Sequence, residues 1–218
     1  MKFKLIVLML VIQASFVKAQ NWDVNLLNKF NPNGGNESSS WKFVSNHAIY
    51  MSAATPLTLM AISMINHDQK LKQTAFNTGI ALLGNTAMTM MMKNTIQRQR
   101  PFVSYSDKIV LQGNTSPTDY SFPSGHTSTA FSVATSVSLA YPKWYVIAPS
   151  FAFAGATAYS RMYRGAHYPS DVLAGVLVGT GSAYLTHKLQ KVMFNKRSDR
   201  RARALALAQA QENQYGID

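Results

Sequence analysis

The chain of 218 residues contains no cysteine and only nine acidic residues against 21 Lys and Arg, giving a formal net charge of +12. Without cysteine it has no disulfide scaffold, no thiol nucleophile and no Cys-ligated zinc or iron–sulfur centre. Charged residues make up 14% of the chain, well below the usual ~25%. The mean hydropathy of −0.06 leaves a membrane protein and a water-soluble protein both open, and the length suits one domain.

The N-terminus has the pattern of an export signal. A short basic start, Met1 to Lys4, precedes an unbroken apolar run over 5–12, and Val17-Lys18-Ala19 suits signal peptidase. We predict a signal peptide over 1–19. An uncleaved signal anchor is the alternative, and in both cases the segment that follows is exported. Residues 20–46 are predicted to be a turn-rich exported lead-in, with no evident chemistry.

Five later stretches contain no Asp, Glu, Lys or Arg. They are rich in Ala, Leu and Met and too long for ordinary strands, so each predicts a helix. The chain is therefore predicted to be all-α. The stretches are 47–66, 73–92, 127–142, 144–160 and 172–186.

The lengths and flanking charges of these helices favour a membrane protein. The first two stretches have 20 residues, enough for a ~30 Å hydrocarbon core, whereas the last three, with 15 to 17, are marginal. With the N-terminus outside, ten cations, including those over 188–203, fall on the cytoplasmic side. Gly175 and Gly179 add a small-residue face for close helix packing. A soluble periplasmic helical bundle is the alternative.

Three cations stand at the expected outer ends of these helices: Lys93, Arg100 and Arg161. An Arg fork or a Lys point charge is suited to bind a phosphoryl group, although cations at helix ends also occur without such a role. Between them, Pro123-Ser-Gly-His126 opens a predicted helix, whose free backbone amides and serine hydroxyl favour an anion.

A histidine and a carboxylate follow at helical spacing. His167 and Asp171 are four residues apart, so the carboxylate can reach the imidazole if the backbone turns helically. Such a carboxylate fixes the tautomer of the ring and leaves its other nitrogen free to attack.

In order, Lys93-x6-Arg100-Pro101, Pro123-Ser-Gly-His126 and Ser160-Arg161-x5-His167-x3-Asp171 resemble the type 2 phosphatidic acid phosphatase superfamily. The helices at 47–66, 73–92 and 172–186 fit the helical bundle of this family. We predict a domain over 47–190 with five transmembrane helices after the signal peptide, followed by a basic tail over 191–218. The resemblance implies that His167 is the nucleophile, that Asp171 orients it and that His126 is the general acid and base. The implied phosphate-binding residues are Lys93, Arg100, Ser124, Gly125 and Arg161. No metal or cofactor is implied.

The predicted function is therefore metal-independent hydrolysis of a lipid phosphate or diphosphate through a phosphohistidine. The substrate class includes undecaprenyl diphosphate, phosphatidylglycerophosphate, phosphatidic acid and lipid A phosphates. The predicted location is a bacterial inner membrane, with the site facing the periplasm. The alternatives are a soluble periplasmic acid phosphatase, a vanadium haloperoxidase, which shares the motifs, and a non-enzymatic membrane protein.

Other basic and apolar features leave more than one interpretation open. Arg98 and Arg164 match no fixed motif position and are candidates for contacts behind the site or to the substrate headgroup. The methionines at 88 and 90–92 suit acyl-chain contact or ordinary packing. The tail cations over 196–203 suit anionic lipid or a solvated end. The positive charge is divided between the tail and the phosphate site, so nucleic-acid binding is not indicated. The sequence does not specify an oligomeric state.

Overall fold

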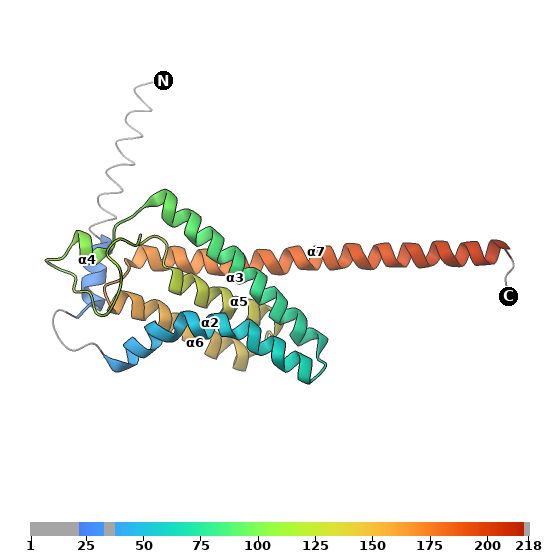
Figure 1. The fold of residues 1–218 in the computed structure, drawn as a ribbon, viewed down its shortest axis with the longest axis horizontal. Coiled ribbons are helices and arrows are strands. Elements are labelled where there is room, and N and C mark those ends of the chain that lie inside the picture. Colours follow the sequence, from blue (N-terminus) through green and yellow to red (C-terminus); the bar gives the residue numbers. More distant parts are fainter. Residues whose placement is uncertain (1–21, 33–37, 216–218) are drawn as a thin grey trace, which may run out of the picture.

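The computed structural model describes residues 22–32 and 38–215, so the predicted signal peptide lies outside the described residues. Figure 1 shows a bundle of helices, and the described residues form no strand. The helices are α2 (Ser39–Ile65), α3 (Gln69–Ile96), α4 (Pro101–Ser104), α5 (Gly125–Ala140), α6 (Trp144–Tyr163) and α7 (Pro169–Tyr215). The all-α prediction is confirmed, and each of the five charge-free stretches lies largely within one long helix.

Helix α5 is the centre of the bundle, because it contacts α2, α3, α6 and α7. Its close packing on α7 depends on the two glycines predicted to form a small-residue face. A Cβ built on Gly175 would lie 2.7 Å from the Ser124 carbonyl oxygen, and one on Gly179 would lie 2.1 Å from that of Ser128. Both approaches are closer than a methyl group allows, so glycine is required for this contact.

Local signals explain where the helices turn. Asp68 caps α3, its carboxylate accepting from the Leu71 N–H at 3.0 Å. Gln97 ends α3 in the left-handed region, with φ of 51°. Gly165 has φ of +65° between α6 and α7, where a Cβ would meet the Val110 carbonyl oxygen at 2.7 Å. The chain therefore returns toward the start of α7 through a turn that favours glycine.

The bundle has small and polar side chains inside and large apolar side chains outside. The buried apolar residues of α2 to α7 are mostly alanines, and Ser and Thr residues such as Thr78, Thr127 and Ser128 are fully buried. Large apolar side chains are exposed on α2, α3, α6 and α7, among them Leu57, Leu83, Trp144 and Leu177. A water-soluble bundle has the opposite arrangement. By length and composition, α2 qualifies as a membrane span, and it is the one such helix among the described residues.

The predicted character of the lead-in needs correction. The lead-in over 20–46 is not mainly turns: residues 22–30 are helical, and α2 begins at Ser39. At the other end, α7 continues to Tyr215 and extends well past the other helices in Figure 1, so residues 191–215 of the predicted basic tail continue this helix. The side chains of its predicted basic patch over 196–203 lie outside the described ones.

Candidate active site

The predicted site residues gather at one end of the bundle, from five segments of the chain. Lys93 lies in the last turn of α3, Arg100 precedes α4, and His126 lies in the first turn of α5. Arg161 lies in the last turn of α6, and the α6–α7 turn that follows holds His167. The positions of these charged side chains and histidines are thus set by the ends of the helices.

The His167 side chain is buried, with 2% of the residue exposed. Its Nδ1 lies 3.6 Å from Asp171 Oδ2 and 3.4 Å from the Ser121 hydroxyl oxygen. The Ser121 hydroxyl donates to Asp171 Oδ2, so its oxygen remains able to accept from an Nδ1–H. The Asp171 carboxylate also accepts from the Tyr168 N–H at 2.9 Å. Asp171 and Ser121 therefore favour the tautomer with the proton on Nδ1.

The other ring nitrogen, Nε2, contacts Arg100. The Arg100 Nη1 lies 3.2 Å from it and also donates to the Ala166 carbonyl oxygen at 2.9 Å. Because a guanidinium has donors and no acceptor, Nε2 must accept and hence carry the lone pair. The Arg100 Nε donates to the Asp119 carbonyl oxygen at 3.0 Å, which fixes the plane of the guanidinium.

Both histidines are held neutral by their surroundings. Burial lowers the pKa of His167 well below its ordinary value, and Arg100 and Arg161 lower it further. Burial, with Arg161 and His167 next in effect, lowers the pKa of His126 to about 2. Neutral imidazole is the form that acts as a nucleophile or a base.

Two adjoining cavities open onto these side chains. One, of about 490 Å³, is lined by Lys93, Arg100, Gly125, His126 and His167. The second, of about 570 Å³, is lined in part by Arg161 and Arg164 and shares Arg100, His126 and Asp119 with the first. Six of the eight predicted site residues therefore border these two adjoining cavities.

Ser124 and Asp171 lie behind this space instead of lining it. Ser124 is fully buried, its hydroxyl 3.0 Å from that of Thr127. The Ser124 N–H donates to the Asp171 carbonyl oxygen at 3.0 Å, which ties the start of α5 to the start of α7.

The cations around the cavities are fixed by neutral partners. Lys93 donates to the Tyr120 carbonyl oxygen, and burial lowers its pKa to about 8. Arg161 is 4% exposed and donates to the Ser45 hydroxyl. Its Nε is buried and has no hydrogen-bond partner among the described residues. A buried donor in this state is costly unless a ligand accepts from it, and the adjoining space can hold an anion.

Arg98 and Arg164 have different positions. Arg164 lines the second cavity, donating to the Gln112 carbonyl oxygen at 2.7 Å and to Asn46 at 2.9 Å. Arg98 lines neither cavity but lies behind Asp171, to which it donates at 2.7 Å. It also pairs with Asp23 at 2.7 Å and stacks its guanidinium 3.7 Å from the centre of the Tyr168 ring.

Sequence reasoning missed several of these partners. Asp23, Ser45 and Asn46 fall at the two ends of the lead-in that was predicted to lack chemistry, yet each contacts an arginine at this end of the bundle. Asp23 also accepts from the Ser170 N–H at 2.9 Å. The pairing of Asp23 could have been predicted from the scarcity of acidic residues, because an acid in a chain this basic is expected to pair with a cation.

The family model for the PAP2 superfamily matches residues 74–194. The chain belongs to this superfamily. The matched region includes all eight predicted site residues, and the predicted family is confirmed.

Named phosphatases are among the relatives. The chain is 36% identical to an undecaprenyl-diphosphatase of Sulfolobus acidocaldarius over 45% of this chain and 46% of that protein, about half its length. It is 26% identical to the undecaprenyl-diphosphatase BcrC of Bacillus subtilis over 69% of this chain and 74% of that one. These named relatives are phosphatases, which supports the predicted enzyme class.

A solved structure has the same fold. The crystal structure of Aquifex aeolicus LpxE superposes with a TM-score of 0.61 and 26% identity, covering 77% of this chain and 95% of that chain. The predicted helical bundle of the family is thus confirmed.

Proposed function

We propose that this protein is a membrane-embedded phosphatase that hydrolyses a lipid phosphate monoester or diphosphate without a metal, through a phosphohistidine at His167. The observation that supports this most directly is the pair of contacts on the His167 ring. Nδ1 faces Asp171, while the lone pair of Nε2 points to a cation at the edge of the cavity. In this proposal the catalytic domain spans 47–190, after a signal peptide over 1–19 and the lead-in over 20–46.

The reaction has two displacements. In the first, Nε2 of His167 attacks phosphorus, the bond from phosphorus to the lipid-side oxygen breaks, and His126 gives that oxygen a proton. In the second, His126 takes a proton from water as the water attacks phosphorus. The phosphorus–nitrogen bond then breaks, inorganic phosphate leaves, and the lone pair returns to Nε2.

Substrate binding itself prepares His126 for the first step. In the free site, burial lowers the pKa of His126 most, and the charges of Arg161 and Arg100 lower it further. A bound phosphate dianion offsets those charges, so binding raises the pKa of His126 and favours its protonated form.

The cations around the cavity stabilise the charge of the transition state. Arg100, Arg161 and Lys93 surround the position of the non-bridging oxygens, and the unpartnered Arg161 Nε gains an acceptor there. The second cavity, bordered by Arg164 and Asn46, leaves room for the rest of a headgroup or a second phosphate.

The outer surface of the bundle supports placement in a membrane. Leu57, Leu83 and Leu177 are each at least 66% exposed, on three different helices, whereas the interior consists mainly of small residues. In a bilayer these leucines contact lipid, and the site lies at headgroup level. A lipid then presents its phosphate without leaving the leaflet. We propose the periplasmic face of a bacterial inner membrane.

Phosphate release from a panel of substrates tests the function. Purified full-length protein in EDTA is expected to hydrolyse one or more lipid phosphates faster than short-chain and water-soluble phosphates, and vanadate is expected to inhibit it. Restoration of a lost activity by Mg²⁺ would contradict the metal-independent mechanism. Equal rates on soluble esters would favour a soluble-type acid phosphatase, and bromide oxidation with vanadate and peroxide would favour a haloperoxidase.

Cysteine labelling in cells tests the orientation, because the chain has no cysteine of its own. A Ser106→Cys variant, in the exposed loop near the site, is expected to react with an impermeant maleimide from the periplasm. A matched Asn66→Cys variant, between α2 and α3, is expected to stay unlabelled until the cells are lysed. Both proteins should remain in the membrane pellet after carbonate extraction. Release into the soluble fraction would contradict the membrane placement.

A further inference from the structure

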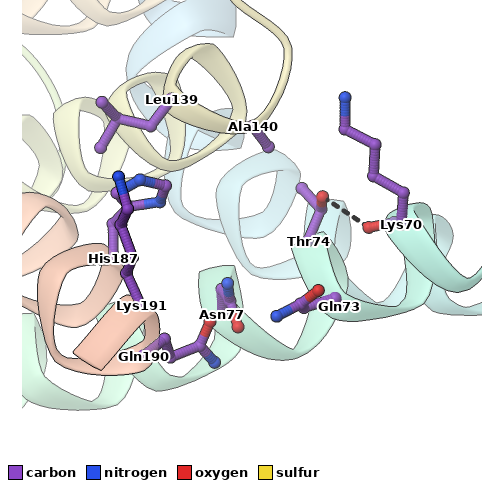
Figure 2. A pocket seen from close by; sticks show the side chains of 9 residues that line it. All are labelled: Lys70, Gln73, Thr74, Asn77, Leu139, Ala140, His187, Gln190 and Lys191. Atoms are coloured by element: carbon purple, nitrogen blue, oxygen red, sulfur yellow. Dashed lines mark hydrogen bonds between the residues drawn. The ribbon is translucent and has the colours of Figure 1, made fainter. Parts of the chain in front are cut away.

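A separate cavity lies at the opposite end of the bundle. It has a volume of about 270 Å³ and is lined by side chains of α3, α5 and α7. Figure 2 shows Gln73 and Asn77 of α3 together with His187 and Gln190 of α7, with Leu139 and Ala140 of α5 above them in that view. Lys70 of this cavity and Lys93 of the catalytic cavity are on the same helix, ~35 Å apart at ~1.5 Å per residue. That separation is close to the thickness of a bilayer's hydrocarbon core.

The side chains around this cavity suit an anion. Lys70, Lys191 and His187 line it, and among the residues that the structure describes neither Asp nor Glu does. The Lys70 ammonium lies 4.5 Å from the centre of the Tyr141 ring, a cation–π contact that holds the charge near the end of α5. The nearest acid along α3 is Asp68, whose carboxylate accepts from the Leu71 N–H.

Two amide oxygens in the cavity lack a hydrogen-bond donor. The Asn77 Oδ1 and the Gln190 Oε1 are buried and have no partner among the described residues. Both residues line the cavity, on α3 and α7 respectively. A ligand that suits this set therefore has anionic oxygens for the lysines and hydroxyl groups that donate to the amide oxygens.

We propose that this cavity binds a phosphate ester bearing free hydroxyls, the chemistry of a phosphoglycerol headgroup. Binding there is not catalytic, because one histidine without a carboxylate partner lacks the nucleophile and orienting acid of the other end. In the proposed membrane orientation this end lies at the headgroup level of the cytoplasmic leaflet. The ligand is then either an anionic lipid of that leaflet or a free glycerol phosphate.

Native mass spectrometry of the full-length protein tests the proposal. The probe is phosphatidylglycerol, compared with phosphatidylcholine of the same acyl chains. The Lys70→Ala/Lys191→Ala double variant is expected to bind at least about tenfold less phosphatidylglycerol than the wild type, because the variant removes two positive charges that line the cavity. The matched control, Lys72→Ala/Lys188→Ala, removes the same charge from exposed positions of the same helices outside the cavity. It is expected to stay within about twofold of the wild type.

Three results decide the outcome. Equal losses in the two double variants, or no loss in the cavity variant, would overturn the proposal. If the cavity variant loses phosphatidylglycerol as expected, glycerol 3-phosphate is added to the wild type. Displacement of the lipid shows that the free ester is sufficient for binding. Failure to displace it assigns the site to a lipid headgroup. Neither double variant changes the catalytic end and no turnover is measured, so this result is independent of the proposed function.

Discussion

The two ends of the helical bundle both gather cations, but they hold them differently. At the end with His167, Arg100 and Arg161 are buried, 6% and 4% exposed, and are fixed by backbone carbonyls and a hydroxyl. At the other end, Lys70 and Lys191 are exposed at the rim of a cavity without a carboxylate. Fixed, desolvated charges suit the stabilisation of a transition state, whereas exposed lysines suit recognition.

The largest effect is expected at the predicted nucleophile. We expect His167→Ala to lower kcat by at least ~10⁴-fold, because the variant lacks the imidazole that is proposed to accept the phosphoryl group. His126→Ala should cost ~10²–10⁴-fold, the usual range for general acid–base catalysis. Steady-state phosphate release measures both. Equal and mild losses would contradict the assigned roles.

The next effect concerns the packing that supports the catalytic end. We expect Gly179→Ala to destabilise the protein by ~1–3 kcal/mol, because its Cβ would lie 2.1 Å from the Ser128 carbonyl oxygen. Thermal unfolding in detergent measures this loss. Gly181→Ala on the same helix is the control, since a Cβ there meets nothing within 4 Å. A Tm equally low in both variants would contradict the close packing of α7 on α5.

A smaller effect on kcat is expected from changing Arg98, which donates to the Asp171 carboxylate. Lysine cannot bridge Asp171 and Asp23 as the guanidinium does, so Arg98→Lys should lower kcat by about 10-fold, or ~1.4 kcal/mol of transition-state stabilisation. KM should stay unchanged, because Arg98 lines neither catalytic cavity. A rise in KM at constant kcat would instead indicate that Arg98 contacts the substrate.

The smallest effect is on the alkaline pH profile. The pKa of Lys93 is lowered to about 8, so its ammonium loses its charge as the pH rises through that value. We expect kcat/KM to fall there, because an uncharged amine binds phosphate less well. Lys93→Arg should keep the charge and shift this fall to higher pH, whereas Lys108→Arg, at an exposed position, should not. An unchanged profile in the Lys93 variant would contradict the assignment.

Much of the catalytic end could be predicted from the sequence, because its residues lie in short motifs at helix ends. His167 and Asp171 are four residues apart, a spacing that brings the two side chains together in a helical turn. The absence of charge over long stretches predicts the helices that bring the motifs together. The prediction of a turn-rich lead-in was wrong, because the helices in this segment are stabilised by tertiary contacts. Asp23 is buried against Arg98, 75 residues away, and Asn31 donates to the Tyr163 carbonyl oxygen, 132 residues away.

The same limit explains Ser121 and the opposite cavity. Ser121 stands outside any motif, and its contact with Asp171 depends on the path of the loop that returns to Arg98, whose carbonyl oxygen accepts from the Ser121 N–H at 2.7 Å. The opposite cavity depends on where α3, α5 and α7 diverge, which no local pattern encodes. The sequence predicts the inner and outer faces of these helices poorly, because Ser and Thr are buried where apolar residues are expected.

Trapping the covalent intermediate tests the central claim most directly. The His126→Ala variant, mixed with a ³²P-labelled substrate that has a good leaving group, is quenched at alkaline pH, where phosphohistidine is stable, and its peptides are mapped. The account predicts acid-labile label on His167 and none in a His126→Ala/His167→Ala control. Label on another residue, or turnover in EDTA by the His167→Ala variant at the wild-type rate, would contradict it.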